Sequence, residues 1–78
     1  MASQNESLTL TREQKREIES LFNFNSKWAT MTQGEYSSNP FVSACNTIVA
    51  MLKILGVSDI ETTSAEVDGA PYEKISLS

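Results

Sequence analysis

Apolar positions recur at helical spacing in the middle of the chain, over residues 40–55. At about 100° per residue, most of the apolar side chains of this segment fall within one half of a helix circumference. Asn39 is a suitable N-cap, and Pro40 suits the first helical position, where the missing N–H has no intrahelical partner. Gly56 follows the last apolar residue and can close the helix in the left-handed conformation. The pattern predicts a central, buried helix.

A second helical pattern precedes this one and begins at Thr11-Arg12-Glu13-Gln14, which has the spacing of a capping box. Five apolar residues at helical spacing form one stripe, namely Ile18, Leu21, Phe22, Trp28 and Ala29. The intervening residues 23–26 are poor helix formers. The sequence therefore leaves two alternatives open, a helix that ends near Asn23 and a helix that continues weakly to Ala29.

Between these helices, Thr32-Gln33-Gly34-Glu35 repeats the capping-box spacing, and Tyr36 can anchor a short turn. Residues that precede a proline avoid the α region, so only one or two turns fit before Pro40. We expect a short helical elbow here. A DNA-binding helix-turn-helix is not favoured, because the second helix carries one lysine and a broad apolar face where base-reading side chains should project.

Two β-prone runs, residues 60–67 and 70–77, flank Asp68-Gly69, which is a strong signal for a hairpin with a type I′ turn. A two-residue loop divides the apolar residues between the two faces of the hairpin. A three-residue loop with a bulge instead gathers four of them on one face, namely Ala65, Val67, Ile75 and Leu77. We prefer the bulged register because it gives a single apolar face. An isolated hairpin is marginal in water, so it must lie on the central helix, pair with another chain, or both.

Together these elements predict one small α+β domain over residues 11–78, with an N-terminal helix, a short helical elbow, a central buried helix and a C-terminal β-hairpin. The mainly polar residues 1–10 predict a flexible arm. Leu8 and Leu10 in this arm could dock, and an arm that pairs with a neighbouring subunit is the alternative. The sequence shows neither a secretory signal nor an apolar run long enough to cross a bilayer, which predicts a cytoplasmic protein.

Composition limits the ligands and reactions that the protein can support, because the 78 residues carry a net charge of −4, no histidine and one cysteine. The acidic balance argues against binding to nucleic acid or to an anionic membrane. Without histidine, the usual general base and the usual nitrogen ligand for metals are absent. Cys45 lies on the apolar face of the central segment and is expected to be a buried hydrophobe. We therefore expect no catalysis, no cofactor and no metal.

Large apolar residues remain that a single small domain would struggle to bury, which favours an interaction surface. The candidate interaction residues are Phe24, Trp28, Met51, Ile54 and Tyr72. The favoured function is non-catalytic protein–protein association, most simply homo-oligomerisation, with another protein as the other possible partner. The composition is compatible with many small accessory proteins, including those that phages encode.

The alternative function rests on charge, since the stretch from residue 54 to residue 73 contains five acids and no base. These acids are Asp59, Glu61, Glu66, Asp68 and Glu73. They could form an acidic surface that occupies a basic site on a nucleic-acid-handling enzyme, as an inhibitor or decoy does. Decoy binding should weaken with salt, whereas association through apolar surface should not.

Overall fold

The computed structural model describes residues 9–78, which form two helices and one two-stranded antiparallel sheet. Helix α1 spans Arg12–Met31, helix α2 spans Pro40–Ile54, and strands β1 and β2 span Ile60–Val67 and Ala70–Leu77. The α+β class is confirmed. The predicted arm lies outside the described residues as far as residue 8, and Leu10 is half-buried against the core.

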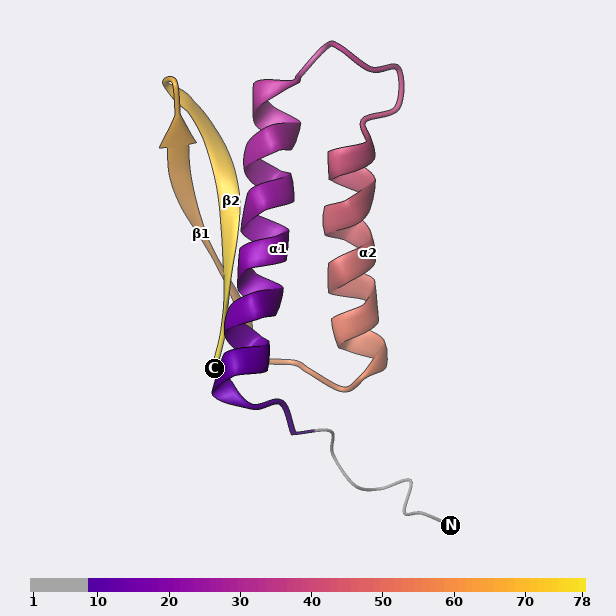
Figure 1. The fold of residues 1–78 in the computed structure, drawn as a ribbon, viewed down its shortest axis with the longest axis vertical. Helices are drawn as coiled ribbons and strands as arrows, with labels where there is room; N and C mark the ends of the chain where they lie inside the picture. Colours follow the sequence, from indigo (N-terminus) through magenta and orange to yellow (C-terminus); the bar gives the residue numbers. More distant parts are fainter. Residues whose placement is uncertain (1–8) are drawn as a thin grey trace.

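Helix α1, and not α2, is the element around which the others are arranged (Figure 1). It packs against α2 on one side and against the hairpin on the other, mainly against β2. The prediction of a central buried helix over residues 40–55 is not confirmed. Only Cys45 and Leu52 of α2 are buried, whereas Ile54 is 82% exposed.

Helix α1 begins at the predicted capping box and continues beyond both predicted ends. The Thr11 hydroxyl accepts from the Gln14 N–H at 3.0 Å, and the Gln14 side chain accepts from the Thr11 N–H at 2.9 Å. The poor helix formers after Phe22 do not stop the helix. Asn25 donates to the Leu21 carbonyl of its own helix, and Asn23 accepts from the hairpin. The helix therefore gains tertiary contacts where its local propensity is weak.

The predicted helical elbow is wrong, because residues 32–39 form turns and bends rather than a helix. The Thr32 hydroxyl donates to the Trp28 carbonyl at 2.7 Å and so completes the end of α1 instead of starting a new helix. The Asn39 side chain joins the two helix ends: its Oδ1 accepts from the Phe41 N–H, and its Nδ2 donates to the Ala29 carbonyl. These contacts tie the start of α2 to the end of α1.

Helix α2 has the ends that its sequence predicts. Asn39 is its N-cap and Pro40 its first residue. At its C-terminus, Gly56 has a φ of 89°, the Val57 N–H donates to the Leu52 carbonyl, and the Gly56 N–H donates to the Lys53 carbonyl. This pair of hydrogen bonds is a Schellman motif, which turns the chain out of the helix and towards β1.

The hairpin closes with a two-residue turn, so the predicted three-residue loop with a bulge is wrong. Val67 pairs with Ala70, and Asp68 and Gly69 have φ values of 52° and 81°. These are the positive φ values of a type I′ turn, which matches the twist of the strands without a bulge. The apolar residues are divided between the faces as a consequence. Ile75 and Leu77 lie together on one face, and Ala65 and Val67 lie on the other.

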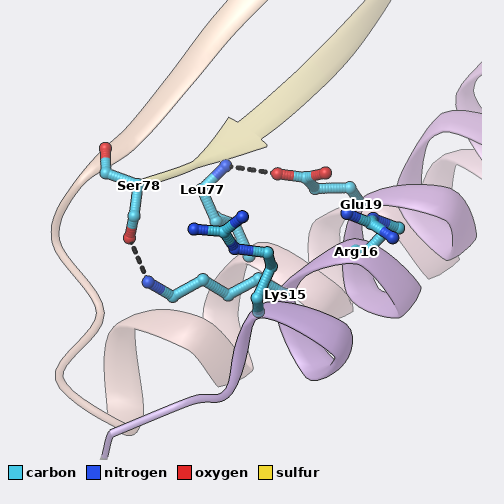
Figure 2. A pocket seen from close by; sticks show the side chains of 6 residues that line it. Lys15, Arg16, Glu19, Leu77 and Ser78 are labelled. Carbon is cyan, nitrogen blue, oxygen red and sulfur yellow. Dashed lines mark hydrogen bonds between the residues drawn. The ribbon is translucent and has the colours of Figure 1, made fainter.

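Polar side chains of α1 cover the outer edge of β2. Glu19 Oε2 accepts from the Leu77 N–H at 2.7 Å, and Asn23 Oδ1 accepts from the Ile75 N–H at 2.9 Å. Figure 2 shows the Glu19 contact beside a second one, in which Lys15 Nζ donates to the Ser78 carbonyl. By the alternation of an antiparallel ladder, Pro71 falls on the same edge, where its missing N–H leaves no donor unsatisfied.

The core is small. Within residues 9–78, five hydrophobic side chains are buried, and they come from both helices and from β2. They are Phe22, Cys45, Leu52, Ile75 and Leu77. Leu52 is the most buried, at 2% exposure. Two residues of the predicted α1 stripe are not covered, since Leu21 is 58% and Trp28 38% exposed.

The turn makes a direct prediction for Gly69→Val. A β-branched side chain in the left-handed region costs about 1–2 kcal/mol, so we expect the melting temperature to fall by roughly 5–10 °C. Gly69→Asn is the control, because asparagine tolerates this conformation and should cost much less. Thermal unfolding followed by circular dichroism measures both. Equal melting temperatures for the two variants would contradict the assignment of a type I′ turn with a positive φ at Gly69.

Candidate interaction surface

A continuous band of exposed apolar side chains crosses the face that α1 and α2 form together. At one end, Leu21 of α1 meets Met51 and Leu55 of α2 around a shallow cavity of about 200 Å³ that also reaches the buried Leu52. Leu21, Met51 and Leu55 are 58%, 56% and 45% exposed. The polar backbone is satisfied within the helices, so this end offers water only apolar surface.

The band continues along α1 into a group of aromatic rings. Phe24 follows Leu21 by one helical turn, and its ring centroid lies 6.2 Å from that of Trp28. Trp28 lies 6.3 Å from Phe41 of α2, and Phe41 lies 6.5 Å from Tyr36 in the connecting loop. Such spacings are typical of tilted aromatic pairs. We call the whole set the apolar strip; its members are Leu21, Phe24, Trp28, Tyr36, Phe41, Met51 and Leu55.

The apolar strip lies away from the hairpin. On α1, Asn23 and Thr30 contact β2, and Leu21 and Trp28 lie two residues before each of them. Two residues correspond to about 200° around a helix. The hairpin therefore covers the opposite side of α1, whereas on the strip's side α2 covers these residues only in part and leaves Leu21 58% and Trp28 38% exposed.

Three of the five candidate interaction residues meet on this strip, namely Phe24, Trp28 and Met51. Ile54 lies three residues after Met51 on α2, but it is 82% exposed and does not line the cavity that Leu21, Met51 and Leu55 share, so it is not a member of the strip. Tyr72 is half-buried in a separate groove. The sequence did not single out Leu21 and Leu55, since both fit an apolar stripe that was expected to be buried. Only the rotation of each helix about its axis distinguishes a covered residue from an exposed one.

The groove that contains Tyr72 lies between α1, α2 and β2 and has a volume of about 400 Å³. Its lining includes Phe22, Cys45, Val49 and Glu73. The Cys45 thiol donates to the Phe22 carbonyl at 3.6 Å. Burial, and to a smaller extent the charge of Glu73, raises the pKa of Cys45. The thiol is therefore held in its neutral form, which is the less reactive one.

The raised pKa of Cys45 predicts a loss of stability in alkali. Above the pKa of an unfolded thiol, about 8.5, the unfolded chain releases a proton that the folded protein retains. Stability therefore falls as the pH rises through this range. Urea unfolding at a series of pH values, compared between the native protein and Cys45→Ala, isolates the effect. A constant difference in midpoint from neutral to alkaline pH would contradict it.

A basic pocket lies where α1 begins and β2 ends (Figure 2). Arg12, Lys15 and Arg16 line it, and Glu19 lines it with them. Lys15 and Glu19 are already engaged with the backbone of Ser78 and Leu77. Two of the four charged side chains that line the pocket, Lys15 and Glu19, therefore join α1 to the hairpin.

The five acids of the candidate acidic surface do not share one face. Glu61 and Glu66 are an odd number of residues apart on β1 and so lie on opposite faces of the hairpin. Asp68 is in the turn and Asp59 precedes β1. Glu73 lines the groove beside Cys45. The negative charge is therefore spread around the hairpin.

Among the residues that the structure describes, no group of three or more cysteine, aspartate or glutamate side chains is placed to hold a metal ion. Neither α1 nor α2 has the length and apolar character needed to cross a membrane. Comparisons with protein-family models, with curated proteins and with solved structures find no match for this chain. We therefore infer function from the geometry of the surface.

Proposed function

We propose that the protein acts by non-catalytic association with another protein molecule, which it binds through the apolar strip. The observation that carries the proposal is the continuity of the strip from Leu55 to Tyr36 across both helices. Scattered apolar side chains are normal on a protein surface, whereas a contiguous set that includes Trp and Phe is typical of interfaces.

Energetics support the same proposal. Complete burial of a large apolar side chain is worth about 1.5–3 kcal/mol, so covering side chains that are half exposed recovers a substantial part of this free energy at each. Aromatic side chains contribute most, and three of the members that stay 38–57% exposed are Phe24, Trp28 and Tyr36. A partner that covers the strip would also shield the thin core from water.

The acidic inhibitor or decoy remains the alternative, and the excess of acids between residues 54 and 73 supports it. Its weakness is that Glu61 and Glu66 point to opposite faces of the hairpin, so one basic site cannot engage them together. Ionic strength separates the two functions. Association through the strip should hold or strengthen as salt is raised, whereas decoy binding should weaken steeply.

Site-specific photo-crosslinking tests the proposal. A benzophenone side chain replaces Phe24, and the matched control places the same group at Ile54, which is more exposed but lies off the strip. After illumination of cells that produce the protein, we expect covalent adducts from position 24 at several times the yield from position 54. Adduct yield and mass are read from denaturing gels and mass spectrometry. Equal yields at the two positions would contradict a role for the strip.

A further inference from the structure

We propose that the partner on the apolar strip is a second copy of this chain, packed so that the two α1 helices run antiparallel across a two-fold axis near Leu21 and Phe24. This inference rests on the proposed function and adds the identity and orientation of the partner. In the assembly, the helical face of each copy would pack on that of the other as two layers of two helices, and each hairpin would lie beside its own α1.

The area of the strip fits a dimer of this size. Six members of the strip are each roughly half exposed, and large side chains present about 150–250 Å² each, so one copy offers roughly 600 Å². A standard interface buries about 800 Å² per partner, and the polar rim of the strip would supply the rest. The core of five buried side chains is small for one domain, which also favours a second layer.

The side chains on α1 have the spacing of a helix–helix seam. Leu21, Phe24, Trp28 and Met31 are separated by three, four and three residues, as the a and d positions of a heptad are. All four are exposed, with Met31 at 41%. Because each a or d side chain inserts between those of a facing helix, the seam predicts a helix as its occupant. Helix α1 of a second copy supplies the same seam.

Charge selects the antiparallel orientation. Glu17 lies four residues before Leu21, Lys27 lies three residues after Phe24, and both are exposed. When Leu21 of one copy packs on Phe24 of the other, Glu17 of each copy falls opposite Trp28 of the second copy, one residue along from Lys27, so that the Glu17 and Lys27 side chains can meet. A parallel pair would instead put Glu17 beside Glu17 and Lys27 beside Lys27. Opposite charges across an interface fix its register, and like charges oppose the alternative.

Helix α1 on its own does not favour Glu17. Glu13 and Glu17 are one turn apart, and like charges at this spacing destabilise a helix. Replacing Glu17 with lysine converts the pair to opposite charges and so should stabilise the monomer. The same substitution should weaken the proposed dimer, because it brings two lysines together. An effect on folding and an effect on association therefore have opposite signs at this position.

Sedimentation equilibrium over a range of concentrations tests the dimer. We expect the native protein to dimerise reversibly, Phe24→Glu to be monomeric with a native circular dichroism spectrum, and Ile54→Glu to dimerise as the native protein does. A native protein that stays monomeric at every concentration would overturn the proposal. A Phe24→Glu variant that dimerises like the native protein would do the same.

Charge reversal tests the orientation. Glu17→Lys and Lys27→Glu are each expected to raise the dissociation constant of the dimer at least about tenfold at low salt. The double variant Glu17→Lys/Lys27→Glu restores opposite charges and is expected to return within about threefold of the native value. A double variant as weak as either single one would overturn the antiparallel arrangement.

Self-association and selective crosslinking together distinguish a second copy from a different protein partner. If the native protein is monomeric but position 24 crosslinks selectively to a protein of another mass, the second copy is excluded and the proposed function stands. If neither self-association nor selective crosslinking at position 24 is found, the proposed function itself is wrong.

Discussion

Leu52→Asp is expected to unfold the protein. Leu52 is 2% exposed and packs with Phe22, Cys45, Ile75 and Leu77. Removing a buried leucine side chain costs about 2–5 kcal/mol, and a buried carboxylate without a partner adds several kcal/mol to that cost. A domain of this length has a total stability of about 4–12 kcal/mol. The substitution therefore removes most or all of the stability.

The matched control is Ile54→Asp, on the same helix two residues away. Ile54 is 82% exposed, so the charge stays in water and the change in stability should be within about 0.5 kcal/mol. Urea unfolding followed by Trp28 fluorescence and by circular dichroism measures both variants. If Leu52→Asp kept a native midpoint, the core described above would be wrong.

The second large effect is expected from Glu19→Ala combined with Asn23→Ala. Each side chain accepts a hydrogen bond from a β2 N–H, and the bond to the charged Glu19 is worth about 1.5–3 kcal/mol and that to Asn23 about 1 kcal/mol. Without these acceptors the N–H groups of Ile75 and Leu77 lose their partners on α1, and a hairpin has little stability of its own. We expect a loss of roughly 2–4 kcal/mol in the double variant.

Hydrogen exchange locates this loss. In the double variant, the Ile75 and Leu77 amides should exchange at least about tenfold faster than in the native protein. Asn25→Ala is the matched control, because Asn25 donates only to its own helix and should leave these amides protected. Glu19→Gln should also preserve protection, since its amide oxygen can still accept. Unchanged exchange at both amides in the double variant would show that α1 does not hold the hairpin.

The start of α1 and both ends of α2 were predictable because local contacts determine them, whereas the end of α1 at Met31 was not. Thr11 and Gln14 satisfy each other, Asn39 with Pro40 begins α2, and Gly56 ends it, each within a few residues. The prediction of a helical elbow was wrong for a reason that is also local. Thr32 had the right spacing for a second capping box, but its hydroxyl was already used by the Trp28 carbonyl at the end of α1.

The hairpin register and the position of α2 depend on tertiary packing. The sequence favours the bulged register because that register gives a single apolar face. In the structure the hairpin contacts α1 mainly through β2, only Ile75 and Leu77 of the hairpin are buried, and the Asp68-Gly69 turn determines the register. Likewise, Phe24, Trp28 and Met51 could be named from the sequence, but their meeting depends on how α1 and α2 are rotated against each other.

The contacts between α1 and β2 also set a limit on the sheet. Four residues advance about 6.0 Å along a helix, and two residues advance about 6.8 Å along a strand. Glu19 and Asn23 can therefore match Leu77 and Ile75, but the difference of about 0.8 Å accumulates with every further pair. Side chains of a helix can therefore accept hydrogen bonds from successive N–H groups on a strand edge over only a short distance. A longer β2 would have edge N–H groups that acceptors on α1 could not match.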